Sequence, residues 1–174
     1  MILATLDDGS RDGRLVALSR DHDRYLAADD VAPSLLAAFD GWDAALSGLA
    51  RLGERLNAGE GLAVDGQRFA APMPRSWQWL DGSAFGTHGK LMQIAFGLDP
   101  IESDRPLMYQ GMSDRFFAPN ADIPFRDPSD GIDFEGEFGV IVDHVPMGTT
   151  AAEAMGHIKL IVQINDWSLR AIAP

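Results

Sequence analysis

Alternating apolar and polar residues predict a small sheet at the start of the chain. Residues 2–6 and 14–19 are rich in apolar and β-branched side chains, and the loop between them contains Gly, Ser and Asp. This arrangement is typical of a β-hairpin. Residues 25–27 are compatible with a third strand.

From Pro33 onward the apolar residues follow helical spacing. Leu35, Leu36 and Phe39 predict a short helix that ends at Gly41. A second helix follows, and we expect its apolar residues to pack in a core because such stripes bury one helix face. They are Trp42, Ala45, Leu46, Leu49, Leu52 and Leu56.

Residues 58–74 are rich in Gly, Ala and Pro and form a candidate linker. We therefore expect a small N-terminal α/β domain over residues 1–71 and a second domain over residues 72–174. In that second domain, Trp77 and Trp79 predict a strand that runs into a loop.

Asp81 and His88 fall in this predicted loop, ahead of a helix expected over residues 90–96. Binding residues often gather in loops, although a lone histidine there is more commonly an ordinary surface residue. A long irregular segment is expected over residues 99–131.

Two further strands are predicted near the end of the chain. Residues 133–142 alternate acidic and apolar side chains, and residues 158–164 form an apolar run that is typical of a buried strand with Asp166 beyond its end. Between them, Thr150 and Glu153 have the spacing of a capping box, which predicts a short helix. The remaining histidines, His22, His144 and His157, are interpreted as turn or cap residues.

The most informative motif is the Glu135-Gly136-Glu137 sequence in the first of these strands. Side chains two apart in a strand share a face at about 6.7 Å, so the two carboxylates lie side by side. They repel each other unless a cation lies between them, and hard divalent ions prefer such oxygen ligands. The alternative is an edge strand with a solvated acidic face.

Composition narrows the possible functions. The chain has 174 residues with a formal net charge of -12, which repels nucleic acid and anionic lipid. Cysteine is absent, so any metal must be bound by oxygen or imidazole. The sequence contains neither a signal peptide nor an apolar run of membrane length, and we expect a cytoplasmic protein.

Four segments occur in the order found in the fumarylacetoacetate hydrolase family. They are Asp81 seven residues before His88, residues 106–111, residues 133–142 and residues 164–170. The chain resembles bacterial members with a small N-terminal domain, and the resemblance covers most of residues 72–174. It implies an α+β fold, a catalytic domain built mainly as a mixed-sheet β roll, a homodimer, and a bound Mg²⁺ or Ca²⁺.

The resemblance also implies roles for individual residues. Glu135, Glu137 and Asp166 match carboxylates that bind the metal, and Asp81 matches a fourth such ligand in the hydrolase itself. His88 matches the histidine that activates water. An all-oxygen site of this kind suits a hard ion that also binds substrate oxygens.

The implied substrate site differs from that of the hydrolase. Tyr109 matches a tyrosine that lines the substrate pocket, but Ser83 stands where the hydrolase has a second, substrate-contacting tyrosine. Gly97 stands where it has an arginine that binds a substrate carboxylate. These differences argue against fumarylacetoacetate itself and favour a related acylpyruvate or diketo acid.

The family's catalytic lysine and the carboxylate that partners its histidine would lie after Pro174. We therefore expect this chain to be the first part of a longer protein, with its catalytic domain truncated. We expect it to need its C-terminal remainder or an oligomer for stability, and to lack hydrolase activity alone.

The resulting hypothesis is a metal-dependent hydrolase that cleaves a carbon–carbon bond in a β-diketo acid. A decarboxylase, isomerase or hydratase acting on a 2-oxo acid is an alternative that would use the same metal ligands. A non-catalytic fragment or binding module is a second alternative, in which the acidic cluster is only structural.

Overall fold

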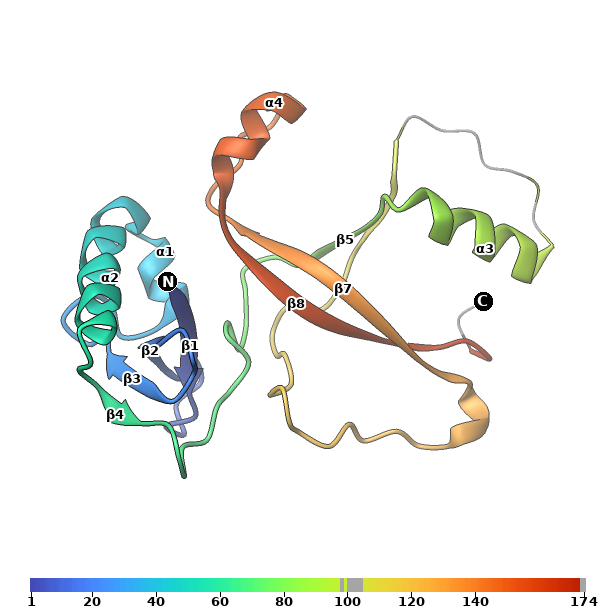
Figure 1. Ribbon diagram of the computed structural model, residues 1–174. Helices are drawn as coiled ribbons and strands as arrows, with labels where there is room; N and C mark the ends of the chain where they lie inside the picture. The colour runs from blue at the N-terminus through green and yellow to red at the C-terminus, as the bar shows by residue number, and fades with distance from the viewer. Residues whose placement is uncertain (98, 100–104, 173–174) are drawn as a thin grey trace. The chain divides into compact units, whose positions relative to one another are not determined.

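The computed structural model describes residues 1–97, 99 and 105–172, and the chain divides into two compact units, Met1–Ala121 and Asp122–Pro174 (Figure 1). Part of the predicted irregular segment, residues 100–104, lies outside the described residues. Each unit is described by itself below. The combination of helices with antiparallel sheets confirms the predicted α+β fold class.

The first unit begins with a four-stranded antiparallel sheet in the order β1-β2-β3-β4. Its strands are β1 (Ile2–Leu6), β2 (Arg14–Leu18), β3 (Arg24–Ala27) and β4 (Leu62–Ala63). The predicted hairpin and third strand are confirmed. Gly13 in the β1–β2 turn has a φ of 63°, and a Cβ there would lie 2.7 Å from the Leu6 carbonyl oxygen, so glycine is required.

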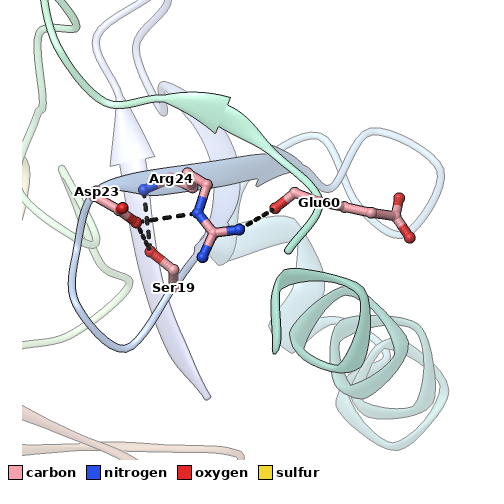
Figure 2. Close-up of polar contacts among 4 residues, drawn as sticks. All are labelled: Ser19, Asp23, Arg24 and Glu60. Carbon is pink, nitrogen blue, oxygen red and sulfur yellow. Dashed lines mark hydrogen bonds and ion pairs between the residues drawn. The ribbon is translucent and has the colours of Figure 1, made fainter. Parts of the chain in front are cut away.

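A polar network fixes the turn between β2 and β3 (Figure 2). Ser19 Oγ donates to Asp23 Oδ1 at 2.9 Å and accepts the Arg24 backbone N–H at 3.0 Å. The Arg24 guanidinium donates to Asp23 at 3.2 Å and to the Glu60 carbonyl at 3.5 Å, which links β3 to the segment before β4. His22 lies in this turn in the left-handed backbone region, with a φ of 62°. This conformation agrees with its predicted place in a turn.

Two helices follow in this unit, α1 (Leu35–Phe39) and α2 (Trp42–Asn57), and both were predicted. Helix α2 packs against β2 and β3, and α1 packs against α2. Ser34 caps α1 through a 3.1 Å hydrogen bond from the Ala37 N–H. The α2 stripe is buried as expected except at Leu46, which is 42% exposed. The prediction that Leu46 lies in the core is wrong. Leu46 follows Ala45 by about 100° around the helix, and this rotation places it outside the buried face.

The predicted linker is tied to β1 by several hydrogen bonds. Phe69 forms a β-bridge with Leu6, and Thr5 Oγ1 donates to the Pro72 carbonyl at 2.6 Å. Arg75 binds both oxygens of Asp12 at 2.6 and 2.9 Å. These contacts hold the segment against the first sheet and its β1–β2 turn as far as residue 75.

The rest of the first unit contains a two-stranded antiparallel sheet of β5 (Leu80–Ser83) and β6 (Leu107–Gln110), with α3 (Gly86–Phe96) between them in the chain. The expectation that Asp81 and His88 lie in a loop is wrong. Asp81 is in β5, and His88 is in the first turn of α3 because that helix begins four residues before Lys90. Neither Gly86 nor Gly89 has a neighbour within 4 Å of a Cβ position, so close packing does not require glycine at either position.

The second unit is built on a long antiparallel pair, β7 (Ile132–Val142) and β8 (Ile158–Leu169). A 3₁₀ turn, η1 (Pro128–Asp130), precedes β7. Between the strands lie α4 (Ala151–Ala154), with the predicted capping box of Thr150 and Glu153, and the 3₁₀ turn η2 (Met155–His157).

The second of these strands differs from its prediction in two ways. It continues to Leu169 because residues as far as Ile132 in β7 pair with it, so Asp166 lies inside the strand rather than beyond its end. It is also not buried: Ile161 is 74% exposed, and alternate residues face solvent.

Buried apolar side chains are confined to one part of the chain. Among the described residues, every hydrophobic side chain of the core lies between Leu6 and Ala71. Leu15, Val16 and Leu49 are fully inaccessible. In the same residues, no helix combines the length and the apolar character needed to cross a bilayer.

Candidate functional site

The pairing of β7 with β8 places the predicted metal ligands of the second unit on one face. Glu135 lies directly opposite Asp166, and directly opposed residues of an antiparallel pair project to the same side. Glu137, two residues along β7, shares that side. Carboxylate oxygens of Glu137 and Asp166 lie within 4.8 Å of each other, close enough to contact one ion.

Glu135 makes two hydrogen bonds within this face. Ser168 Oγ donates to Glu135 Oε1 at 2.5 Å, and Arg170 Nη2 donates to the same oxygen at 2.6 Å. Arg170 Nε also donates to Asp133 Oδ2 at 3.0 Å. One arginine therefore bridges two acidic residues of β7.

Ser168 and Arg170 have no individual role predicted from the sequence. The signal that could have found them is the two-residue period of a strand, which places residues 166, 168 and 170 on one side. That signal was missed because the strand was predicted to end at Ile164.

The β5–β6 sheet groups three predicted site residues of the first unit. Asp81 is directly opposite Tyr109, and Ser83 is two residues along β5 from Asp81. All three therefore share one face of that sheet. Tyr109 is 51% exposed, and its ring meets Trp79 edge to face at a centroid distance of 5.6 Å. Its hydroxyl-bearing side chain is thus anchored without being buried.

His88 is positioned by α3, where it is half-buried in the first turn. Of the histidines given structural roles, His157 has the clearest contacts. Its Nδ1 lies 2.5 Å from Asp143 Oδ1, and Lys159 Nζ lies 3.0 Å from Asp143 Oδ2. The hydrogen bond from His157, followed by that from Lys159, lowers the pKa of Asp143 below its usual range.

The sequence matches two known protein-family descriptions over adjoining segments. Residues 1–75 match the fumarylacetoacetase N-terminal domain 2, and residues 78–174 match the fumarylacetoacetate (FAA) hydrolase C-terminal domain. The chain belongs to the fumarylacetoacetate hydrolase family. No curated protein matches it.

Membership of the fumarylacetoacetate hydrolase family confirms the resemblance inferred from the sequence motifs. The β5–β6 sheet, α3 and the β7–β8 pair all fall within the segment that matches the FAA hydrolase domain. Every predicted site residue therefore lies in that domain. The family supports an enzymatic activity of the hydrolase or decarboxylase type.

The acidic face of β7–β8 fits a hard divalent ion. Its donors are all carboxylate oxygens, and Glu137 and Asp166 already approach each other. Mg²⁺ and Ca²⁺ favour oxygen ligands, whereas softer ions favour the thiolates that this chain lacks.

Proposed function

We propose that this chain carries the metal site of a hydrolase that cleaves a carbon–carbon bond in a β-diketo acid or acylpyruvate. The observation that carries the proposal is the approach of the Glu137 and Asp166 carboxylates to within 4.8 Å on the face of β7–β8 that Glu135 shares. Two carboxylates this close repel each other, and a divalent cation would relieve that repulsion. Asp81 is proposed as a fourth ligand through the family resemblance.

A divalent ion held by these carboxylates would act as a Lewis acid toward a β-dicarbonyl substrate and stabilise the negative charge of the departing enolate. The protein supplies the proton transfer. An imidazole nitrogen of His88 accepts a proton as the oxygen of water bonds to a substrate carbonyl carbon. The bond to the neighbouring carbon then breaks, and its electron pair leaves with the enolate.

The substrate is proposed to contact the β5–β6 sheet. Ser83 and Tyr109 place two hydroxyl groups on the same face, where they can donate hydrogen bonds to carbonyl or carboxylate oxygens. The exposed Tyr109 ring also offers an apolar surface for the acyl part of an acylpyruvate.

Calorimetric titration with Ca²⁺ and Mg²⁺ tests the metal site directly. Glu137→Gln keeps the shape of the side chain but removes one charge, and we expect it to weaken binding at least about tenfold, since ligand charge sets affinity at such sites. Asp122→Asn is the matched control, because Asp122 is an exposed acid of the same unit outside β7–β8. Equal affinities for the wild type and Glu137→Gln would contradict the proposal.

The proposed role of His88 predicts a different pattern. In the intact enzyme, His88→Ala is expected to reduce turnover of acetylpyruvate by about a hundredfold or more while Ca²⁺ affinity stays unchanged. Full activity in this variant would contradict its role as a base. Loss of Ca²⁺ binding in this variant would show that His88 supports the metal site instead of accepting a proton from water.

Product analysis separates hydrolysis from the other reactions of the family. Acetylpyruvate gives two carboxylic acids on hydrolysis, but it gives carbon dioxide on decarboxylation. Isomerisation or hydration would leave its carbon skeleton intact. Detection of acetate and pyruvate supports the hydrolase, and carbon dioxide would favour the alternative.

We also propose that the protein works as a homodimer. Support comes from the face of β7–β8 opposite the carboxylates, where Phe134, Phe138 and Ile161 are 55%, 86% and 74% exposed. Contiguous apolar surface of this kind is typical of association sites. Light scattering coupled to gel filtration would measure the mass, and a monomer at all concentrations would contradict the dimer.

A further inference from the structure

A glycine opposite Trp79 makes room for its indole ring. Gly111 follows β6, and its backbone N–H donates to the Trp79 carbonyl at 3.1 Å, which continues the pairing of β5 with β6 by one residue. A Cβ at Gly111 would overlap the ring atoms Cε3 and Cζ3 of Trp79. Gly111 does not have a positive φ, so it is the ring, and not a left-handed backbone, that requires glycine here.

Trp79 shares the face of the β5–β6 sheet that carries the proposed substrate residues. It lies two residues before Asp81, and Gly111 lies two residues after Tyr109, so these positions face the same side. The Trp79 side chain is half-buried, and its ring meets the Tyr109 ring edge to face. It thus occupies the space beside Tyr109 that a side chain at position 111 would otherwise fill.

The neighbours of Tyr109 toward the other end of this face are exposed. Along β6 the next residue on the face is Leu107, which is 75% exposed, and the residue opposite Leu107 is the short, exposed Ser83. Trp79 is the larger and more enclosed neighbour. It is therefore the one suited to hold the Tyr109 ring at a fixed angle, since aromatic pairs favour a defined edge-to-face geometry.

We propose that Trp79 is a positioning residue for Tyr109: seated on Gly111, its ring fixes the angle at which the Tyr109 side chain meets the substrate. The inference rests on the substrate contact of Tyr109 in the proposed function. A small displacement of a substrate-binding group weakens its contact even when its own chemistry is unchanged. Trp79 acts through Tyr109 and needs no contact with the substrate itself.

NMR spectroscopy of the full 174-residue chain tests the geometry without any activity. The chain contains two tyrosines, and the other one, Tyr25, is 7% exposed in the N-terminal core, so isotope-labelled tyrosine gives ring signals from two different environments. Trp79→Ala should shift the Tyr109 ring signals because the neighbouring indole is lost. Gly111→Ala should shift them because the added methyl group displaces the indole. Unchanged Tyr109 signals in Gly111→Ala would overturn the inference.

Gly82→Ala is the matched control within the same sheet. Gly82 lies on the opposite face of β5, and a Cβ there would meet Met108 Cγ at 3.7 Å, an ordinary contact. This variant should leave the Tyr109 signals as they are in the wild type. A shift equal to that in Gly111→Ala would overturn the inference, because a methyl group away from Trp79 would then have the same effect. Thermal melting of each variant separates displacement of a ring from loss of folding.

Steady-state kinetics of the intact enzyme with acetylpyruvate test the consequence for the substrate. Trp79→Ala and Gly111→Ala are each expected to raise KM about three- to tenfold with kcat nearly unchanged, because the contact serves substrate and transition state alike. Trp79→Phe keeps an aromatic ring beside Tyr109 and should change KM less than Trp79→Ala does. In a Trp79→Ala background, Gly111→Ala should raise KM no further, since the ring it displaces is gone. Additive increases would overturn the inference.

The remaining outcomes separate the inference from the proposed function. If Tyr109→Ala raises KM and Trp79→Ala does not, the positioning role is overturned while the substrate contact of Tyr109 stands. If Tyr109→Ala leaves KM unchanged, the proposed substrate contact is overturned, and the positioning role with it.

Discussion

The N-terminal sheet with its two helices and the β7–β8 pair distribute their side chains in opposite ways. In the first, Leu15, Val16 and Leu49 are fully buried, and charged residues lie outside. In the second, Glu135, Glu137 and Asp166 are half-buried while Phe138 and Ile161 are exposed. The first arrangement is that of a stable domain core, and the second, with exposed apolar side chains opposite an acidic face, is typical of a surface that binds other groups.

The largest expected effect comes from the buried leucine of α2. Leu49→Ala should lower the free energy of unfolding of the N-terminal sheet and helices by about 2.7–5 kcal/mol, because it leaves a cavity in a closed core. Phe138→Ala is the matched variant on β7 and, at concentrations too low for the proposed homodimer, should change stability by less than about 0.5 kcal/mol. Hydrogen-exchange mass spectrometry can measure each region separately. A large loss in Phe138→Ala at the same low concentration would break the comparison, since it would show that this apolar face is covered within a single chain.

Added Ca²⁺ should stabilise the β7–β8 pair and leave the N-terminal sheet unchanged. At a Ca²⁺ concentration of about a hundred times the Kd, binding stabilises the metal-binding unit by about 2.7 kcal/mol. Amides of β7 and β8 should then exchange more slowly, whereas those of β2 should be unchanged. Glu137→Gln serves as the control, and equal protection in both regions would contradict a local metal site.

A single buried hydroxyl should have an intermediate effect. Thr5 is fully buried and donates to the Pro72 carbonyl, so Thr5→Val keeps the side-chain shape but leaves that carbonyl without its partner. We expect a loss of about 1–3 kcal/mol by urea unfolding. Thr5→Ser, which retains the donor, should lose less. If valine is tolerated as well as serine, the hydrogen bond does not secure the segment at Pro72.

The smallest expected effect is the pH dependence at the end of the β7–β8 pair. The pKa of Asp143 is lowered in the folded protein by hydrogen bonds from His157 and then Lys159. The resulting stability is present above the pKa of an unfolded aspartate, about 3.9, and is lost as the pH falls through the lower folded value.

Carboxyl NMR titration can measure this shift. His157→Asn should move the pKa of Asp143 upward, because the largest cause of its lowering is removed. His144→Asn is the control, since it replaces the histidine next to Asp143 in the sequence and leaves His157 in place. A pKa for Asp143 that is the same in the wild type and in His157→Asn would contradict this contact.

Local patterns predicted most of the elements correctly. The strands predicted at residues 2–6 and 14–19, the helix break at Gly41 and the capping box at Thr150 all follow from short-range chemistry and are confirmed, with the second strand ending at Leu18. The face shared by Glu135 and Glu137 needed only the two-residue period of a strand.

The errors concern features that depend on partners distant in the sequence. Strand β8 extends past Ile164 because β7 supplies hydrogen-bonding partners, and no local pattern specifies that register. The contacts of Glu135 with Ser168 and Arg170 join residues 33 and 35 positions apart. The boundary between the domains, predicted at residue 71, and the roles of the site residues stay predictions.

The restriction of the buried core to residues up to Ala71 has a consequence for synthesis on the ribosome. The last residue of this core, Ala71, leaves the exit tunnel about 60 residues before Ile132, the first residue of β7, does so. At about 5–20 residues per second, that interval lasts about 3–12 s, long enough for a small domain to fold. The growing chain thus acquires a folded N-terminal body before its acidic and apolar strands leave the exit tunnel.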